Sequence, residues 1–160
     1  MARAFVALGG NLGDMHATLR QALVALAALP QTRLLAHSRF YRTPPWGMLE
    51  QPPFLNAAAA LDTALTPHEL LDALLGIERA AGRVREGERW GPRTLDLDLL
   101  HIDGVRLHDD RLTLPHPRIA GRAFVLLPLA ELAPDLDLPG QGQVDELLGA
   151  LDTSGCVPEP

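Results

Sequence analysis

The sequence contains no lysine, and all 14 of its basic residues are arginine. Without lysine the chain cannot form a Schiff base with a carbonyl substrate, and it cannot supply the lysine of a Walker A phosphate loop. Any phosphate that it binds must therefore be held by arginine, histidine, backbone N–H groups or a metal ion. The formal net charge of −6 argues against a nucleic-acid-binding surface, because such surfaces are usually basic.

Cysteine is almost absent as well, since Cys156 is the single one in 160 residues. One cysteine excludes an intramolecular disulfide and argues against a thiolate metal site. No apolar run approaches the roughly 20 residues of a membrane-spanning helix, and the apolar stretch before Gly9 is too short for a signal peptide. With 47% hydrophobic and 21% charged residues, the composition predicts a globular protein. Because no signal peptide or membrane-spanning run is recognised, we expect the protein in the cytoplasm.

The most informative stretch is Arg89–His101, which reads RWGPRTLDLDLLH. Its second half alternates leucine and aspartate, as in a β-strand whose successive side chains point to opposite faces. The alternation puts three leucines on one face (Leu95, Leu97 and Leu99). It puts Asp96 and Asp98 together on the other face, a spacing that suits carboxylates converging on divalent ions. Arginines just upstream could bind phosphate oxygens, so this stretch favours a nucleotide-phosphate site.

Simpler interpretations of the same residues stay open. Alternating acids on a half-exposed strand are common, so Asp96 and Asp98 alone could merely solvate its outer face. Residues 83–93 carry four arginines, and charge runs are usually solvated faces, although we expect a mobile loop that abuts the acidic strand. Trp90 in this loop either pins it to the core or closes over a ligand.

The apolar periodicity predicts strands at 3–8, 33–43, 54–63 and 94–102, and helices at 15–29 and 66–81. Thr66, Pro67 and Glu69 form a capping box that starts the second helix. We interpret GGNLGD at 9–14 as a turn whose Asp14 caps the first helix, rather than as a phosphate loop. Further along we expect a turn at 103–104, short strands at 105–107 and 111–114, a rigid turn at 115–118, a helical segment at 119–132 interrupted by proline, and a helix at 144–151.

The resulting β-α-β-β-α-β order is that of ferredoxin-like folds. We therefore predict an α+β fold with an antiparallel sheet, helices packed on it and extra C-terminal elements. The length predicts one domain, over 1–151. Residues 152–160 are expected to form a disordered tail.

Two polar residues stand in otherwise apolar segments. Asn56, near the start of the strand at 54–63, is either a surface or turn asparagine or one that recognises a ligand by hydrogen bonds. Glu78 lies in the last turn of the second helix, where the helix dipole disfavours a carboxylate. For Glu78 an ion pair with Arg79 or Arg83 and a role in binding a ligand are equally open.

Five stretches together resemble the 6-hydroxymethyl-7,8-dihydropterin pyrophosphokinases of folate biosynthesis: RWGPRTLDLDLL, FYRTPPWG, QPPFLNAA, GRVR and LPHPRIAGRAFVLLPL. They occur in the family's order over residues 3–139. The resemblance implies an α+β ferredoxin-like fold. It also implies ATP-dependent transfer of a pyrophosphoryl group to the pterin hydroxymethyl oxygen, with AMP as the other product.

The resemblance implies a role for individual residues as well. Asp96 and Asp98 would bind two Mg²⁺ ions, and Arg83 and Arg93 would clamp the phosphates in the transition state. The other residues expected at the ATP are Arg85, Arg89, Trp90, Leu99, Arg111, Thr113, His116 and Arg122, to which Glu78 is added in its ligand role. The residues expected at the pterin are Thr43, Pro44, Trp46, Phe54, Asn56 and Phe124, with the two phenylalanines sandwiching the ring.

Two other functions stay open. Paired acids on a strand of a ferredoxin-like sheet also hold metals in polymerase-type nucleotidyltransferases, which release pyrophosphate and usually need a basic template groove. A non-catalytic binding or regulatory domain would have to explain the arginines, Trp90 and the Asn–Phe–Pro cluster separately. As partners we expect ATP and the dihydropterin, no nucleic acid and no membrane, and we expect a monomer.

Overall fold

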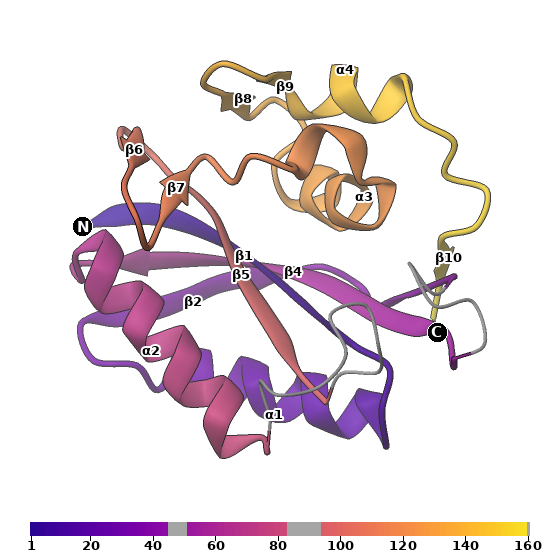
Figure 1. Ribbon diagram of the computed structural model, residues 1–160, viewed down its shortest axis with the longest axis horizontal. Coiled ribbons are helices and arrows are strands. Elements are labelled where there is room, and N and C mark those ends of the chain that lie inside the picture. The colour runs from indigo at the N-terminus through magenta and orange to yellow at the C-terminus, as the bar shows by residue number, and fades with distance from the viewer. Residues whose placement is uncertain (45–50, 83–93, 160) are drawn as a thin grey trace.

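The computed structural model describes residues 1–44, 51–82 and 94–159 (Figure 1). The described elements follow in the order β1 (Ala2–Gly10), α1 (Met15–Ala27), β2 (Thr32–His37), β3 (Tyr41–Thr43), β4 (Phe54–Thr63), α2 (Pro67–Ala80), β5 (Asp96–Ile102), β6 (Leu107–His108), β7 (Thr113–Leu114), the 3₁₀ helix η1 (Ile119–Gly121), α3 (Ala123–Leu132), β8 (Asp137–Leu138), β9 (Gly142–Gln143), α4 (Val144–Gly149) and β10 (Val157–Pro158).

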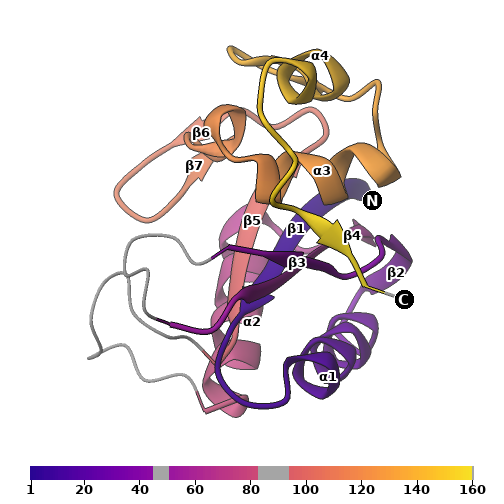
Figure 2. The same cartoon turned by 90° about the vertical axis from the view of Figure 1, so that its right-hand side faces the viewer.

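A six-stranded sheet with the order β10-β3-β4-β1-β5 organises these elements, and β2 also pairs with β4. Every pairing in this sheet is antiparallel. Helices α1 and α2 cover one face of the sheet, α3 lies on the other, and α4 packs on α3 (Figures 1 and 2). The structure thus confirms the prediction of a mixed α and β fold with an antiparallel sheet and helices packed on it.

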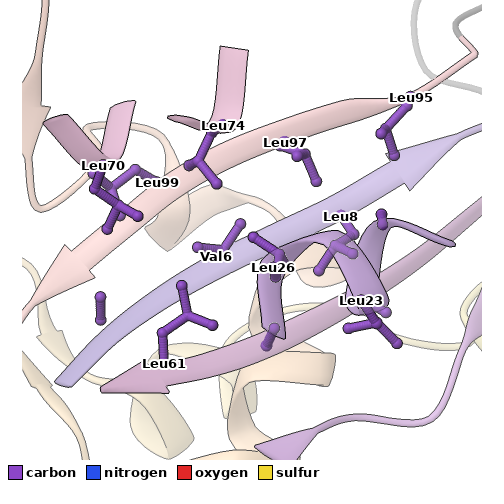
Figure 3. Packing of buried hydrophobic residues seen from close by; sticks show 14 of the residues in the cluster. Val6, Leu8, Leu23, Leu26, Leu61, Leu70, Leu74, Leu95, Leu97 and Leu99 are labelled. Carbon is purple, nitrogen blue, oxygen red and sulfur yellow. The ribbon is translucent and has the colours of Figure 1, made fainter. Parts of the chain in front are cut away.

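The main core lies between the sheet and helices α1 and α2. Alternate residues of the central strands supply Val6, Leu8, Leu61, Leu97 and Leu99, and the helices supply Leu23, Leu26, Leu70 and Leu74 (Figure 3). Burying one leucine side chain stabilises the fold by about 1.5–3 kcal/mol relative to leaving it exposed. Leucines at every second position of the strands here pack against leucines spaced three or four residues apart in the helices. These two hydrophobic patterns determine which face of the sheet the helices cover.

A second core lies between the opposite face of the sheet and α3, and it includes Phe5, Ala60, Leu100, Val125, Leu126 and Leu129. We predicted a helical segment at 119–132 that Pro128 interrupts. This was wrong, because the segment divides at Arg122, and Pro128 lies buried within α3. Proline in a helix interior costs about 3 kcal/mol. The burial of α3 against both the sheet and α4 can offset that cost.

Both predicted helix starts are confirmed. The Asp14 side chain accepts a hydrogen bond from the backbone N–H of Ala17 at 3.2 Å. At α2, Thr66 and Glu69 each accept a hydrogen bond from the other's backbone N–H, at 3.2 and 2.9 Å, which completes the capping box. Local side-chain chemistry alone was enough to locate these two starts.

Two predicted boundaries were wrong. Gly9 and Gly10 belong to β1 rather than to a turn, since they pair with Asn56 and Leu55 of β4. The strand expected at 33–43 divides into β2 and β3. It divides because Ser38 bonds the backbone of Ala58 with both its N–H, at 2.8 Å, and its hydroxyl, at 2.9 Å.

The last described residues lie along the edge of β3. Val157 and Pro158 pair with Arg42 and Tyr41, and the Glu159 N–H donates to the Phe40 carbonyl at 2.7 Å. The segment expected as a disordered tail, 152–160, therefore contributes strand β10. Pairing satisfies backbone groups that an edge strand would otherwise leave open. None of the helices in the described ranges is both long and apolar enough to cross a membrane.

Candidate active site

One row of residues crosses strands β4, β1 and β5 on the face that α3 covers. Gly9 of β1 pairs with Asn56 of β4 on one side and with Asp96 of β5 on the other. Neighbouring strands lie about 4.8 Å apart, so the Cα atoms of Asn56 and Asp96 are separated by about 10 Å. An amide and a carboxylate therefore stand on either side of a glycine.

The adjacent row continues this surface with small side chains. Ala7 of β1 pairs with Ala58 of β4 and with Asp98 of β5. Between the asparagine and the two aspartates the sheet thus presents one hydrogen atom and two methyl groups. Glycine and alanine here leave the side chains of Asn56, Asp96 and Asp98 as the groups that project furthest from this part of the sheet.

The alternation predicted for the acidic strand is confirmed. Its three leucines are 1–5% exposed and lie in the main core (Leu95, Leu97 and Leu99). Asp96 and Asp98 alternate with them and are only partly buried. The core therefore anchors β5 by its leucines and turns both carboxylates toward the opposite face.

Glu78 of α2 supports the backbone of this strand. It is 2% exposed at the end of α2, and its Oε2 accepts the Leu97 N–H at 2.8 Å. That hydrogen bond falls on the residue between the two aspartates, so Glu78 fixes the backbone that carries them. Sequence reasoning missed this role, because a carboxylate in a last helical turn does not reveal which backbone group it contacts.

Arg122 and His116 lie within electrostatic reach of the two carboxylates. Burial lowers the pKa of Arg122, while the charges of Asp98 and Asp96 oppose that shift. Burial, and then the positive charges of Arg122 and Arg118, lower the pKa of His116, and Asp96 acts in the opposite direction. At neutral pH His116 is consequently an uncharged hydrogen-bonding group near the cations Arg122 and Arg118 and the carboxylate of Asp96.

A cavity of about 330 Å³ opens next to Asp98. Its lining contains four residues predicted at the ATP, namely Leu99, Arg111, Thr113 and His116. Arg111 is held there by an ion pair between its side chain and Asp72. Its backbone N–H also donates to Asp109 Oδ1 at 2.9 Å. The cavity lining therefore combines apolar, cationic and hydroxyl groups with the carboxylates of Asp98, Asp109 and Asp110.

On the other side of Gly9, the predicted pterin residues of β3 and β4 come together. Asn56 Nδ2 donates to the hydroxyl of Thr43 at 2.7 Å, and Thr43 is 2% exposed. Phe54 pairs with Thr43, and Pro44 follows Thr43 directly in the chain. Phe124 belongs to the first turn of α3, where the Arg122 guanidinium lies 5.7 Å from the centroid of its ring.

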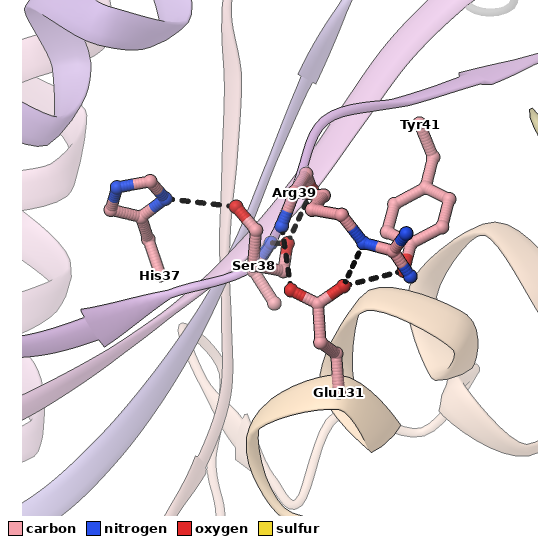
Figure 4. Close-up of polar contacts among 6 residues, drawn as sticks. His37, Ser38, Arg39, Tyr41 and Glu131 are labelled. Atoms are coloured by element: carbon pink, nitrogen blue, oxygen red, sulfur yellow. Dashed lines mark hydrogen bonds and ion pairs between the residues drawn. The ribbon is translucent and has the colours of Figure 1, made fainter. Parts of the chain in front are cut away.

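Glu131 ties α3 to this edge of the sheet (Figure 4). It accepts the Tyr41 hydroxyl at 2.6 Å, the Arg39 Nε at 2.9 Å and the Arg39 backbone N–H at 2.7 Å. Partial burial alone would raise the pKa of Glu131, but the hydrogen bonds from Tyr41 and Arg39 outweigh it and lower that pKa. Tyr41 pairs with Asn56, so this cluster sets α3 relative to the asparagine.

Comparison with known proteins identifies the family. The family described as 7,8-dihydro-6-hydroxymethylpterin-pyrophosphokinase (HPPK) matches residues 5–134. This chain belongs to the HPPK family. The resemblance predicted from the sequence is therefore confirmed.

Curated relatives agree with the HPPK assignment. A Methylorubrum extorquens protein named 2-amino-4-hydroxy-6-hydroxymethyldihydropteridine pyrophosphokinase is 55% identical over 155 residues, which is 97% of each chain. A Pseudomonas aeruginosa protein with the same name is 51% identical over 153 residues, or 96% of this chain and 94% of the other.

Solved structures agree in fold. The Plasmodium falciparum HPPK-DHPS structure with pteroate has a TM-score of 0.73 at 13% identity and matches 93% of this chain. The structure with SDX-DHP has a TM-score of 0.69 at 13% identity and matches 94%. This chain spans less than half of those HPPK-DHPS chains, 42% and 43% respectively. At this identity the likeness concerns the fold alone.

Six of the residues predicted for the HPPK site lie outside the described residues: Trp46, Arg83, Arg85, Arg89, Trp90 and Arg93. Within 1–44, 51–82 and 94–159, no group of three or more His, Cys, Asp and Glu side chains is arranged to hold a metal ion. Asp96 and Asp98 nevertheless fit Mg²⁺, which is commonly held by one or two carboxylates and completes its shell with water and substrate phosphates.

Proposed function

We propose that this HPPK-family protein transfers the pyrophosphoryl group of ATP to the hydroxymethyl oxygen of 6-hydroxymethyl-7,8-dihydropterin in folate biosynthesis. The products are AMP and the pterin diphosphate. The observation that carries this proposal is the row of Asn56, Gly9 and Asp96, with an amide and a carboxylate on the same face of one sheet. Relatives covering nearly the whole chain bear the corresponding pyrophosphokinase name.

The pterin binds on the β3–β4 side of the row. An asparagine amide combines donor and acceptor groups, which suits the edge of a heterocycle with both. Asn56 is held for this task by its hydrogen bond to the buried Thr43. The remaining predicted pterin residues are Pro44, Trp46, Phe54 and Phe124, and the two phenylalanines supply the ring faces.

ATP binds on the β5 side. The cavity of about 330 Å³ beside Asp98 holds the nucleotide against Leu99, Arg111, Thr113 and His116. Asp96 and Asp98 would hold two Mg²⁺ ions, which would supply neutralising charge to the phosphate oxygens. Arg122, within reach of both aspartates, adds a fixed positive charge on the same side.

The separation across the row suits the reaction. About 10 Å between Asn56 and Asp96 leaves room for the ring at one end and the triphosphate at the other, with the reacting atoms between them. The hydroxymethyl oxygen gives up its proton to solvent and forms a bond to the β-phosphorus, the bond from that phosphorus to the α,β-bridging oxygen breaks, and AMP departs. This transfer depends on positioning and on charge stabilisation more than on a covalent nucleophile. We assign to Arg83 and Arg93 the stabilisation of the negative charge on the phosphates in the transition state. We assign to Arg85, Arg89 and Trp90 the closure over the substrates.

We also infer that the core is ferredoxin-like and that 1–151 forms one pyrophosphokinase domain. The support is the order β1-α1-β3-β4-α2-β5, in which β4 and β5 flank β1 and β3 lies outside β4. We further propose a cytoplasmic monomer that acts on small molecules. Its net charge of −6 disfavours nucleic acid as a partner.

Product analysis tests the function. The protein is incubated with Mg-ATP and 6-hydroxymethyl-7,8-dihydropterin, and the nucleotide product is identified by chromatography. We expect one AMP for each pterin diphosphate, and no AMP when Mg²⁺ is removed with EDTA. Release of pyrophosphate would instead indicate a nucleotidyltransferase. No turnover would indicate a non-catalytic domain.

A further inference from the structure

The backbone conformation at position 9 does not require a glycine. Gly9 lies inside β1 and is paired on both sides. Its φ falls outside the left-handed region, unlike that of Gly13 or Gly104. Glycine in a strand interior weakens the strand because it costs chain entropy and packs no side chain. The reason for glycine at this position must therefore be the space that a side chain would fill.

That space is occupied by the side chain of Asn56. A Cβ built on Gly9 would collide with Asn56 Oδ1, and the next nearest atoms are Asn56 Cγ and the Leu55 carbonyl oxygen, both at 3.5 Å. All three atoms belong to β4, and none comes from the acidic strand β5. The atoms nearest to a Cβ at position 9 therefore lie on the asparagine side of Gly9.

The Asn56 amide reaches from β3 to β1. Its Nδ2 donates to Thr43 on β3 at 2.7 Å, while its Oδ1 lies over Gly9 on β1. The carbonyl end is thereby directed along the row toward β5. A side chain at position 9 would force this amide to rotate away and would break its hydrogen bond to Thr43.

We propose that Gly9 is a positioning residue that determines specificity for the pterin by setting the orientation of the Asn56 amide. The ligand edge selected in this way belongs to a flat heterocycle that donates an N–H group to Oδ1. This inference rests on the proposed function and deepens it. Gly9 acts through Asn56, not through the metal or the nucleotide.

Gly9→Ala tests the proposal by comparing its effect on the KM for the pterin with its effect on the KM for ATP. We expect the KM for the pterin to rise roughly tenfold or more, since the loss of one oriented hydrogen bond is worth about that factor. The KM for ATP should stay within about twofold, because none of the nearest atoms belongs to β5. Gly149→Ala is the matched control, since its added Cβ has no heavy atom within 4 Å and its φ is ordinary.

A double-mutant cycle separates this role from a merely structural one. The kinetics of Asn56→Ala and of the Gly9→Ala/Asn56→Ala pair are measured under the same conditions. If Gly9 acts through Asn56, adding Gly9→Ala to the Asn56→Ala background will not raise the pterin KM further. The double variant should be at least as thermally stable as Asn56→Ala, because the collision is gone and glycine no longer weakens the strand interior.

Three results would overturn the proposal: unchanged pterin KM in Gly9→Ala, an equal rise in both KM values, or full additivity in the cycle. If Gly9→Ala alone does not fold, failure of Asn56→Ala to restore folding in the double variant would also overturn it. The proposed function fails differently, because the unmodified protein would then form no AMP at all.

Discussion

At the scale of single residues, Asp98 tests the assignment of the metal-binding acids. It shares its face of β5 with Asp96 and lines the candidate ATP cavity. We predict that Asp98→Ala lowers kcat by roughly a hundredfold or more, since charge stabilisation at the phosphates is lost. Pterin affinity, measured by fluorescence titration, should change little.

A matched control exists on β4, which is separated from β5 by β1. Asp62 of β4 forms a long ion pair with Arg33, at 3.7 Å, near the far end of the sheet. Asp62→Ala should leave turnover unchanged, because such pairs contribute little. If Asp98→Ala turned over as fast as Asp62→Ala, the metal assignment would be wrong.

His101 gives a pH-dependent prediction at the same scale. It is 3% exposed on β5, and its Nε2 lies 3.1 Å from Asp103 Oδ1. Burial lowers its pKa below the ordinary value of 6.5, although Asp103 opposes the shift. Below about pH 6.5 the unfolded chain therefore binds a proton that the native histidine does not. The free energy of unfolding should fall as the pH decreases through this window, by at most about 1.4 kcal/mol per pH unit from this group.

Urea denaturation at about pH 7.5 and about pH 5.5 measures that slope. His101→Gln should show a smaller loss of stability between the two pH values than the unmodified protein does. His16→Gln, at an exposed position in α1, is the control and should retain the full loss. An unchanged slope in His101→Gln would show that the buried histidine is not its source.

Single residues were predictable where the chemistry is local. The alternation of leucine and aspartate in β5 gave the correct faces, and Thr66 and Asp14 gave the correct helix caps. The roles of Glu78 and Glu131 were not predictable, because their partners lie 19 to 92 residues away in the chain. Only the fold brings those carboxylates to their backbone and side-chain donors.

At the scale of elements, the same contrast recurs. Strand β4 was predicted with its observed bounds, since prolines precede it and a capped helix follows. The break between β2 and β3 depends on Ser38 contacting Ala58, which is 20 residues distant. Strand β10 likewise depends on the open edge of β3, which no local pattern at 152–160 reveals.

Strand β10 gives a prediction about the pterin side of the site. It pairs with β3, which carries Thr43, and a Cβ on Gly155 would come within 3.3 Å of the Pro44 ring. Deleting residues 152–160 should therefore lower the melting temperature and raise the pterin KM several-fold, because β3 loses its outer partner. The KM for ATP should not change.

Glu159→Ala provides the control for this deletion. It removes an ion pair with Arg42 that spans 3.9 Å, and it keeps the backbone pairing of β10. Its kinetics and melting temperature should match those of the unmodified protein. If the deletion variant also matched, β10 would have no part in supporting the site.

At the scale of the whole molecule, the candidate site belongs to no single element. Its rows need β4 and β5 on either side of β1, with α3 held over that face by Glu131. The sequence predicted the antiparallel sheet and the family from hydrophobic periods and five stretches of residues. It could not predict that Gly9 pairs with both Asn56 and Asp96, because strand register follows from the assembled core.

The central claim is that Asn56 binds the pterin on one side of Gly9, and that Asp96 and Asp98 bind the metal ions of the ATP on the other side. A crystal structure with Mn²⁺, a non-hydrolysable ATP analogue and the dihydropterin tests it most directly. We predict anomalous density at the carboxylates of Asp96 and Asp98, the pterin edge against the Asn56 amide, and the hydroxymethyl oxygen facing the β-phosphorus. A complex in which both aspartates face away from every cation would contradict the account.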